Sequence, residues 1–307
     1  MALKIYNVGL SSIKLGSISN KNNINIIVGT YDGSLLGYNT EGEEIFSFSI
    51  GDFDIRHIVE DKYGNIYVSY GNIYVVNEEL DGATTYLSSP TTNNTYEFDI
   101  DANGNFYTAS SSGYTTKIDS GDNVLWSYNH GEQVLSVAVN QDGNCFSTSA
   151  FDNSFIKHDL DGSKEWEFFG PSDSVRAVTC DEYGFSYCAA RDNSVTKVDS
   201  SGSQVWRNSS IIPSGRIEDI SVDIHSNVYV ASYGDRIVKL GPDGNILWAF
   251  GNSNFNKVSV DREGNVYGLS IASNKLYAIT SDGQEKWNKD IPSIMSVYSS
   301  GNNVNHR

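Results

Sequence analysis

Short apolar runs, separated by turns rich in Gly, Asp, Asn and Ser, recur along the whole chain. The clearest stretch is Ser174 to Ser209. Four runs of apolar or alternating residues lie in it: Val175–Cys180, Phe185–Ala190, Val195–Asp199 and Gln204–Arg207. Runs of this length are typical of β-strands and too short for most helices. The pattern predicts four antiparallel strands in about 36 residues.

This unit repeats with a period close to forty residues. An aromatic residue marks its last strand each time: Phe46, Tyr86, Trp126, Trp166, Trp206, Trp248 and Trp287. The steps are 40, 40, 40, 40, 42 and 39 residues, and all five tryptophans of the chain fall on this series. Four short strands repeated at this spacing are typical of β-propeller blades. The chain is therefore predicted to be an all-β, seven-bladed β-propeller of four-stranded antiparallel blades.

The turns repeat with the strands. The first turn of most blades reads Asp or Asn, two further residues, then Gly, as in Asp181–Gly184. The third turn places Gly four residues before the aromatic, as in Gly202 before Trp206. Asp122 and Ser226 replace Gly in one turn each. Both changes are tolerable, because Asp can adopt the left-handed conformation that Gly otherwise supplies and Ser226 precedes Asn227.

The aromatic series itself has two interpretations. An outer strand has one neighbouring strand only, so a large flat side chain there can cover the sheet and fill the wedge between blades. Alternatively, the row could stack against a ligand. We favour packing between blades.

The ends of the chain leave the blade count open. Complete blades are predicted to begin near Ile13, Arg56, Glu97, Val134, Val175, Glu218 and Lys257. Residues 2–9 resemble an additional fourth strand, and residues 293–302 an additional first strand. We predict one propeller domain over residues 1–307 with seven blades, and both terminal strands involved in ring closure. The alternatives are eight blades with an incomplete closing blade built from both termini, or terminal strands that pack outside the ring.

Composition narrows the classes of partner. The net charge is −17, from 21 Lys and Arg against 38 Asp and Glu. Nucleic acids and anionic membrane surfaces need a basic face, so both are disfavoured. No apolar run is long enough for a membrane span. The N-terminus lacks the features of a secretory signal, which predicts a cytoplasmic or virion location. Cys145, Cys180 and Cys188 are too few for a disulfide framework, and we expect buried thiols.

Two stretches carry a resemblance to known repeats. Asp261-Arg-Glu-Gly-Asn-Val-Tyr267 and Lys239-Leu-Gly-Pro-Asp-Gly-Asn-Ile-Leu-Trp248 resemble quinoprotein-like (PQQ-like) and NHL-type propeller repeats. The resemblance covers nearly the whole chain and implies the propeller fold, but no particular activity, because such repeats occur in enzymes, scaffolds and adaptors. In its richness in Ser, Asn, Gly and Tyr, the composition also resembles propellers of bacteriophage tail and virion proteins.

Few residues suggest chemistry. Asp99, Asp101 and Asn103 imitate the start of a calcium loop, but position 110, where an EF-hand would close the loop, is Ser. A blade turn is the better account. The five histidines, none of them close to another in sequence, are interpreted as surface or turn residues: His57, His130, His158, His225 and His306. We predict no catalytic residue, no metal site and no cofactor.

The first strands of the blades are expected to line the ring axis. They offer a mixed set of side chains at roughly matching positions: Ser17, Glu60, Asp99, Ser136, Arg176, Asp219 and Ser259. A quinoprotein enzyme would need basic and amide groups on the axis for the carboxylates of the quinone, with a metal beside it. One Arg among several acids does not favour that reading.

The loops between second and third strands are the variable face of a propeller. Here they carry Tyr, Asp and Arg side chains, which suit recognition of proteins or carbohydrates. The candidate partner-binding residues are Tyr31, Asp32, Tyr70, Asp152, Arg191, Asp192, Tyr233 and Asp235. We predict a non-enzymatic structural or interaction platform, most concretely a tail or host-recognition component of a bacteriophage virion. Its partners would be proteins, including other virion proteins, or a host surface glycan. The alternatives are an intracellular or surface adaptor, and a quinoprotein-like or carbohydrate-processing enzyme.

Overall fold

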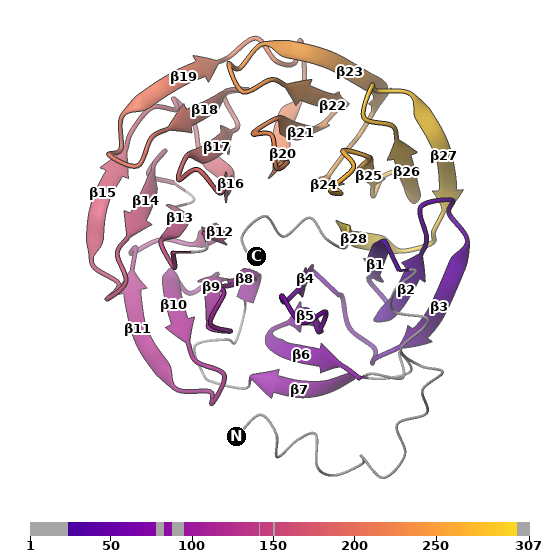
Figure 1. The fold of residues 1–307 in the computed structure, drawn as a ribbon, viewed down its shortest axis with the longest axis horizontal. Coiled ribbons are helices and arrows are strands. Elements are labelled where there is room, and N and C mark those ends of the chain that lie inside the picture. The colour runs from indigo at the N-terminus through magenta and orange to yellow at the C-terminus, as the bar shows by residue number, and fades with distance from the viewer. Residues whose placement is uncertain (1–23, 78–82, 88–94, 141, 150, 300–307) are drawn as a thin grey trace.

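Seven four-stranded antiparallel sheets surround a central axis in the computed structural model (Figure 1). The structure describes residues 24–77, 83–87, 95–140, 142–149 and 151–299. These residues contain strands and turns only, so the predicted all-β propeller with seven blades is confirmed. The eight-bladed alternative is wrong, because the described strands fill seven complete sheets. Within the same residues, no helix has the length and apolar character needed to span a membrane.

Each blade has an inner strand, two middle strands and an outer strand. The inner strands are β4 (His57–Glu60), β8 (Thr95–Ile100), β12 (Val134–Val139), β16 (Val175–Cys180), β20 (Arg216–Val222), β24 (Lys257–Val260) and β28 (Ile294–Ser299). The second strands are β1 (Ile26–Thr30), β5 (Ile66–Tyr70), β9 (Phe106–Ser110), β13 (Cys145–Ser149), β17 (Ser186–Ala190), β21 (Val228–Tyr233) and β25 (Val266–Ser270).

The third strands are β2 (Ser34–Tyr38), β6 (Asn72–Val76), β10 (Tyr114–Ile118), β14 (Phe155–His158), β18 (Val195–Val198), β22 (Asp235–Leu240) and β26 (Lys275–Ile279). The outer strands are β3 (Glu44–Ser49), β7 (Ala83–Leu87), β11 (Val124–Asn129), β15 (Lys164–Phe168), β19 (Gln204–Asn208), β23 (Ile246–Ser253) and β27 (Glu285–Asp290). Blade 1 contains β28 and β1–β3, and blades 2 to 7 follow in chain order from β4.

Blade 1 joins the two ends of the described chain. Its inner strand is β28, which pairs antiparallel with β1, so the last strand of the chain lies beside the first described one (Figure 1). The predicted start of this blade near Ile13 is therefore incorrect. Ile13 and residues 2–9 lie outside the described residues, and the inner position belongs to β28. The idea that the C-terminal strand packs outside the ring is wrong for the same reason.

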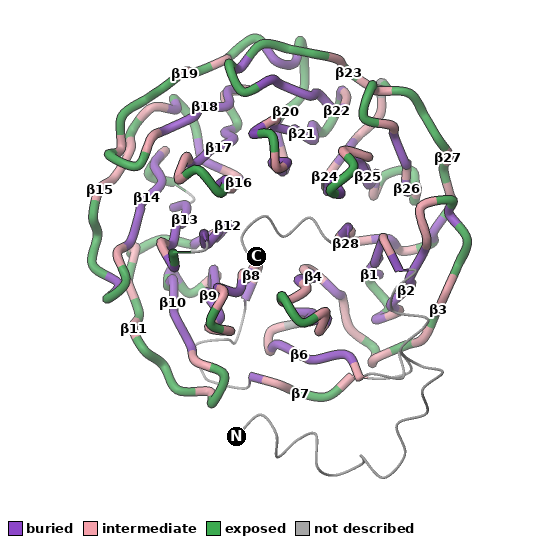
Figure 2. The backbone as a smooth tube through the Cα atoms, in the orientation of Figure 1, coloured by how far each residue is buried: buried purple, intermediate pink, exposed green. Residues whose placement is uncertain are grey.

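Burial follows the position of a strand within its blade. The middle strands are almost continuously buried, whereas the outer strands alternate between exposed and partly buried residues (Figure 2). The core lies mainly between neighbouring blades: one cluster, for example, joins Tyr187 and Val195 of blade 5 to Ile220 and Val230 of blade 6. The three cysteines are buried free thiols, as expected.

The first turns are organised by their Asp side chains. In blade 7, Asp261 accepts hydrogen bonds from the backbone N–H of Asn265 at 2.8 Å and from the Tyr267 hydroxyl at 3.0 Å. Asp101 accepts the same set from Asn105 and Tyr107 in blade 3, which confirms the interpretation of its loop as a blade turn. Asp122 has a φ of 63°, which confirms its expected left-handed conformation, and Ser226, with a φ of 59°, adopts the same conformation.

The tryptophan series joins each of blades 3 to 7 to the blade that follows it. The Trp206 ring in blade 5 lies over Gly244 in the third turn of blade 6, and its Nε1 donates to the carbonyl oxygen of Pro242 at 2.8 Å. Trp166 and Trp248 repeat this contact, and Trp287 donates to Thr40 at 2.9 Å, so that blade 7 is joined to blade 1. The predicted role of the row, packing between blades, is confirmed.

Candidate functional site

The inner strands place three rows of side chains around the ring axis. The mouth row is Arg56, Tyr96, Leu135, Arg176, Glu218, Asn256 and Met295. The upper row, one residue further along each strand, is His57, Glu97, Ser136, Ala177, Asp219, Lys257 and Ser296. The lower row is Val59, Asp99, Ala138, Thr179, Ser221, Ser259 and Tyr298. Residues two apart on a strand face the same side, which explains why the upper and lower rows both reach the axis.

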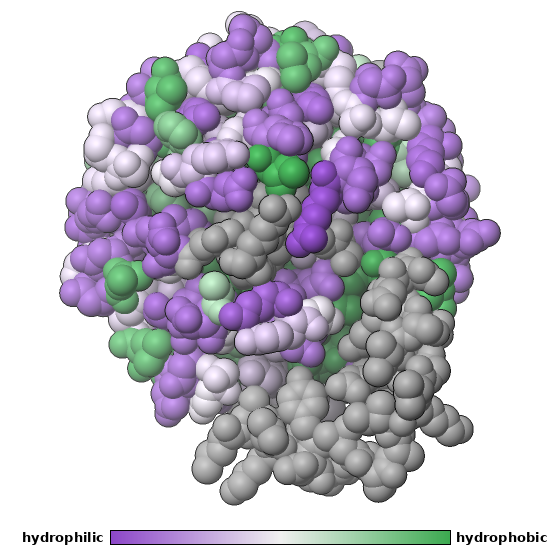
Figure 3. Space-filling model, viewed as in Figure 1, coloured by the Kyte–Doolittle hydropathy of each residue, from purple (hydrophilic) through white to green (hydrophobic). Residues whose placement is uncertain are grey.

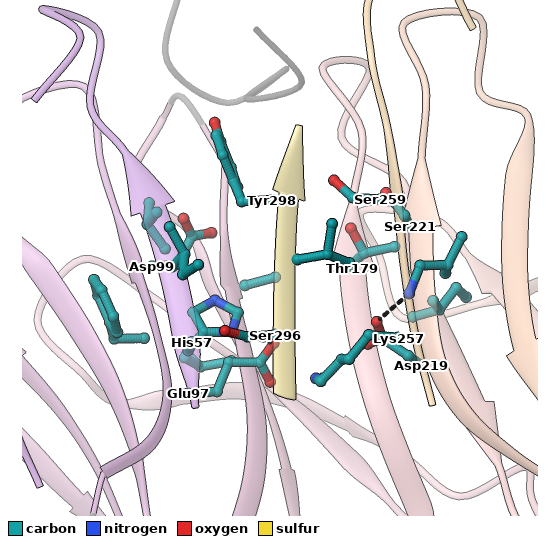
Figure 4. Close-up of a pocket in the computed structure, with 18 of the residues that line it drawn as sticks. His57, Glu97, Asp99, Thr179, Asp219, Ser221, Lys257, Ser259, Ser296 and Tyr298 are labelled. Atoms are coloured by element: carbon teal, nitrogen blue, oxygen red, sulfur yellow. Dashed lines mark hydrogen bonds and ion pairs between the residues drawn. The ribbon is translucent and has the colours of Figure 1, made fainter. Parts of the chain in front are cut away.

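Two connected cavities follow from these rows. A channel cavity of about 140 Å³ is lined by most of the upper and lower rows (Figure 4). A mouth cavity of about 420 Å³ is lined by all seven residues of the mouth row. Arg56, Glu97, Asp219 and Lys257 line both, so the mouth leads into the channel.

Polar side chains on the axis bind the neighbouring blade. Asp219 Oδ2 accepts a hydrogen bond from the N–H of Val258 at 2.9 Å, and Asp99 Oδ2 accepts one from Val139 at 2.9 Å. Ser136 and Ser259 accept the equivalent bonds from Val178 and Ser299 at 3.1 and 3.0 Å. In each case, the side chain meets the backbone N–H one position further along the next inner strand. These polar groups therefore stabilise the ring itself.

Charge in the channel is only partly balanced. Lys257 Nζ lies 3.6 Å from Asp219 Oδ1, and His57 Nδ1 lies 3.7 Å from Glu97 Oε1. Burial raises the pKa of Glu97 and of Asp219, and it lowers the pKa of His57 to about 3. Burial also opposes the charge of Lys257, but Asp219 and Glu97 outweigh it and raise the pKa of the lysine. Lys257 thus stays charged beside several carboxyl groups whose ionisation is opposed by burial, and Arg56, the other cation of the lining, is paired with Asp54.

Asp99 gives the channel a testable pH dependence. Burial raises its pKa from 3.8 to about 7. Between pH 3.8 and about pH 7, the folded protein keeps a proton on Asp99 that the unfolded chain has lost. The contribution of Asp99 to the free energy of unfolding is therefore greatest at acid pH and is lost as the pH rises through 7. We expect the free energy of unfolding of the wild type, relative to Asp99→Asn, to decrease between about pH 5 and about pH 8.

Urea unfolding of both proteins across this range measures the difference. Asp52→Asn, which removes an exposed carboxyl group, is the matched control and should leave the pH profile of the wild type unchanged. Parallel profiles for wild type and Asp99→Asn would show that Asp99 ionises normally in the folded protein.

These residues do not fit the quinone that a PQQ-like repeat suggests. The cofactor carries carboxylates, and the channel walls present Glu97, Asp99 and Asp219. The cations of the lining are Lys257 and Arg56, and Arg56 is already paired with Asp54 at 2.7 Å. The channel cavity is also below the usual size of a cofactor pocket, roughly 300 Å³ or more. No three His, Cys, Asp or Glu side chains within the described ranges are grouped to hold a metal ion.

The predicted axial ring is partly wrong. Asp99, Ser136, Asp219 and Ser259 do face the axis, but in two different rows, whereas Arg176 belongs to the mouth row. Glu60, the last residue of β4, belongs to none of the three rows, and Ser17 lies outside the described residues. The sequence reasoning missed Glu97 and Lys257, which lie two positions before the chosen Asp99 and Ser259. It also missed His57, three positions before Glu60, and Tyr298 on β28, a strand from which no residue was chosen. Counting back from the Asp of the first turn would have identified both rows.

The prediction for histidines is wrong for three of the five. His57 borders the channel. His158 is fully buried, and its Nε2 lies 2.7 Å from Ser147 Oγ, which also lies 3.3 Å from His130 Nε2. Burial lowers the pKa of His130 to about 4 and of His158 to about 3, so both are neutral at physiological pH. His225 lies in a turn as predicted, and His306 lies outside the described residues.

The two faces of the ring differ in their connections. The loop face carries the loops between second and third strands together with the segments that link blades, and the turn face carries the tight first and third turns. Every predicted partner-binding residue belongs to the loop face. On one face of the ring, hydrophilic residues predominate and the hydrophobic ones are dispersed (Figure 3).

The predicted carboxylates all have hydrogen-bond or ion-pair partners within the protein: Asp32 with Thr30, Asp152 with Ser149, Asp192 with Arg207 and Ser172, and Asp235 with Arg236. Tyr31, Arg191 and Tyr233 are exposed, and Tyr233 has the Arg216 guanidinium 4.7 Å from its ring centre. The side chain of Tyr70, at the end of β5, is not described. Partner binding by these loops stays a prediction.

A third cavity extends the mouth outward on the loop face. It measures about 330 Å³ and lies where blades 4 and 5 meet. Gln133, Leu135 and Arg176 line both this cavity and the mouth, so the two adjoin. We name it the blade 4–5 pocket.

Residues 191–305 match the family described as outer membrane protein assembly factor BamB. No curated protein matches the chain. Virginiamycin B lyase from Staphylococcus aureus shares the fold with a TM-score of 0.67 and 14% identity, over 76% of this chain and 83% of the lyase. A streptogramin B lyase structure gives a TM-score of 0.68 and 11% identity, over 77% of this chain and 83% of that one.

A chain of the mitotic checkpoint complex is similar to the same degree, with a TM-score of 0.67 and 13% identity, over 78% of this chain and 77% of that one. At such identities the likeness to the two lyases and to the checkpoint chain concerns the fold alone. The period, the turn motifs, the seven sheets and the match over residues 191–305 agree with one another. The chain has the seven-bladed β-propeller fold, and its residues 191–305 match a family of PQQ-like repeats.

Proposed function

We propose that this protein is a non-enzymatic interaction platform that binds its partner on the loop face. The observation that carries the proposal is the continuity of the mouth cavity and the blade 4–5 pocket, which together open a polar depression on that face. Exposed Tyr31, Phe151 and Tyr233 lie on the loops of the same face. A rigid ring with aromatic and charged groups at its surface suits recognition of a partner, because a preorganised surface loses little conformational entropy on binding.

A structural use for the axial groups supports the non-enzymatic reading. Asp99, Ser136, Asp219 and Ser259 are all engaged by the backbone of the next blade. A catalytic acid or base must instead reach the substrate proton that it transfers. Propellers also carry out binding in complexes, and the mitotic checkpoint complex contains one with this fold.

The most specific form of this proposal is that the protein is a component of a bacteriophage virion. It rests on composition, and it predicts that the partner is another virion protein or a glycan of the host surface. An adaptor that binds a protein partner inside the cell or at its surface is the second setting compatible with the same loop face.

Photo-cross-linking from four exposed tyrosines tests the proposal. Tyr31 and Tyr233 lie on the loop face, whereas Tyr63 and Tyr183 lie in first turns on the turn face and are 78% and 64% exposed. Each is replaced in turn by p-benzoylphenylalanine, and the protein is irradiated in extract of its native source. We expect one adduct of the same mass from both loop-face positions and none from the turn-face positions. Adducts confined to Tyr63 and Tyr183 would contradict the choice of face.

A further inference from the structure

The blade 4–5 pocket has cationic groups that no carboxylate of the protein fully engages. A bulge between Val175 and Ala177 takes Arg176 out of the sheet register and directs it to the pocket wall. Its Nη2 lies 3.1 Å from Glu218 Oε2, while its buried Nε has no hydrogen-bond partner among the described residues. A buried donor without a partner is costly, and a ligand that supplies an acceptor removes that cost.

Arg191 supplies a second guanidinium at the rim. Its side chain is exposed and forms no ion pair within the part of the chain that the structure describes. The neighbouring Asp192 cannot neutralise it in the same geometry, because that carboxylate already accepts hydrogen bonds from Arg207 at 2.6 Å and from the Ser172 backbone at 2.6 Å. The backbone N–H of Arg191 donates a hydrogen bond to the carbonyl oxygen of Ser174 at 3.0 Å, which fixes the backbone at the rim of the pocket.

The single acid of the pocket is engaged locally. Asp173 Oδ1 accepts a hydrogen bond from the N–H of Ser174 at 2.7 Å. The pocket therefore presents two guanidinium groups with unused donors. Guanidinium groups bind carboxylates with charge-assisted and often paired hydrogen bonds. The net charge of −17 does not prevent this, because exposed charges more than a Debye length away, about 8 Å at physiological ionic strength, are largely screened.

The rest of the lining suits a sugar ring. Phe151, 68% exposed, provides a flat apolar surface at the edge of the pocket. Gln133 and Asn153 provide planar amides, which both donate and accept hydrogen bonds. A pyranose ring has one face of C–H groups, which packs on an aromatic ring, and hydroxyl groups around its edge, which bind planar amides.

We propose that the blade 4–5 pocket binds a carboxylated sugar of the uronic acid type, with Arg176 and Arg191 on the carboxylate and Phe151 under the ring. This inference rests on the proposed function, since it names the chemistry of a ligand for the loop face.

Two matched ligands test it. Methyl β-D-glucuronide and methyl β-D-glucoside have the same ring and differ in whether C6 is a carboxylate or a hydroxymethyl group. Calorimetric titration of the full chain is expected to show saturable binding of the glucuronide and at least about tenfold weaker binding of the glucoside. Saturation-transfer NMR should show the strongest effects on the axial protons H1, H3 and H5, the face that meets Phe151.

Variants locate the site. Arg191→Ala and Arg176→Ala should each weaken glucuronide binding about ten- to hundredfold, the range for a hydrogen bond to a charged group. Phe151→Ala should weaken both ligands and remove the preference for the axial protons. Arg236→Ala is the control, because Arg236 also lies on the loop face but is paired with Asp235 at 2.6 Å, and it should bind as the wild type does. Arg191 and Phe151 are exposed, so their variants are expected to fold normally.

Equal binding of glucuronide and glucoside, or wild-type binding by Arg191→Ala, would overturn the proposal. So would tighter binding of an acetylated, amidated Gly-Glu-Gly peptide, which offers the same carboxylate without a sugar ring. The cross-linking positions Tyr31 and Tyr233 lie on blades 1 and 6, away from this pocket. A titration without sugar binding would therefore contradict the sugar site but not the platform proposal. Absence of the loop-face adducts would contradict the platform proposal, and the titration would still test the sugar site.

Discussion

A chain that ends at Ser293, and so lacks β28, is expected to lose cooperative folding. Without this strand, blade 1 has no inner strand, and buried residues on both sides of it become exposed, among them Ile26 and Val28 of β1 and Leu269 of β25. The hydrogen bonds from Ser296 to Ile55 and from Ser299 to Ser259, which join blade 1 to blades 2 and 7, are lost with it. Ring closure then depends on the outer contacts between blades 7 and 1, among them the hydrogen bond from Trp287 to Thr40 and the ion pair of Lys286 with Glu41.

Thermal unfolding followed by near-ultraviolet circular dichroism measures this effect. We expect the shortened chain to show no sharp transition, or a Tm lower by roughly 5 °C or more, because several kcal/mol are lost and each shifts the Tm of a chain of this size by somewhat under about 2 °C. A chain that ends at Ser299 keeps β28 and is the matched control, with an unfolding transition like that of the full chain. Cooperative unfolding at the wild-type temperature in the chain ending at Ser293 would show that β28 does not close the ring.

Trp206→Ala is expected to lower the free energy of unfolding by about 3 kcal/mol, the low end of the range for removing a packed Trp. The low end applies because the Trp206 ring is only partly buried, between blade 5 and the third turn of blade 6. Gly244 lies against this ring with a φ of 80°, and a Cβ built there would lie 2.7 Å from a ring carbon. Gly244→Ala should therefore destabilise the same contact from the other side, through both backbone strain and overlap.

Chemical unfolding with urea compares these variants with two controls. Trp206→Phe keeps an aromatic ring over Gly244 but removes the Nε1 bond to Pro242, so its loss should be smaller, about 1 kcal/mol for the hydrogen bond together with some loss of packing. Val205→Ala removes a half-exposed side chain from the same strand and should change stability least. If Trp206→Ala were as stable as Val205→Ala, the aromatic row would not hold the blades together, and a binding role for it would have to be reconsidered.

Much of the fold could be predicted because each blade repeats the same local chemistry. In the clearest blade, the predicted strand Val175–Cys180 matches β16, and the predicted Gln204–Arg207 differs from β19 by one residue. The turns were predictable as well, because Asp and Gly have conformational roles that act within a few residues. The bond from the Tyr267 hydroxyl to Asp261, six residues earlier, is of the same local kind.

The candidate site was less predictable, because it depends on which residues of seven inner strands reach the axis at the same height. The bulges in β8, β12, β16 and β20 shift one residue out of register and bring Arg176 to the mouth instead of the axis. His57 and Glu97 come close through packing of blade 2 against blade 3, forty residues apart in the sequence. A single strand carries no signal for such a contact.

The sequence by itself determined the type and order of the elements: the strand lengths, the turns, the period and the aromatic at each outer strand. It did not decide which segment completes blade 1, because the segments near Ile13 and near Ile294 both carry the pattern of an inner strand. Hydrophobic pattern specifies that a segment becomes a strand, but its partner depends on contacts across the whole chain. Only the tertiary structure assigned that position to β28, where Ser296 meets blade 2 and Ser299 meets blade 7, because only this arrangement closes the ring on both sides of the strand.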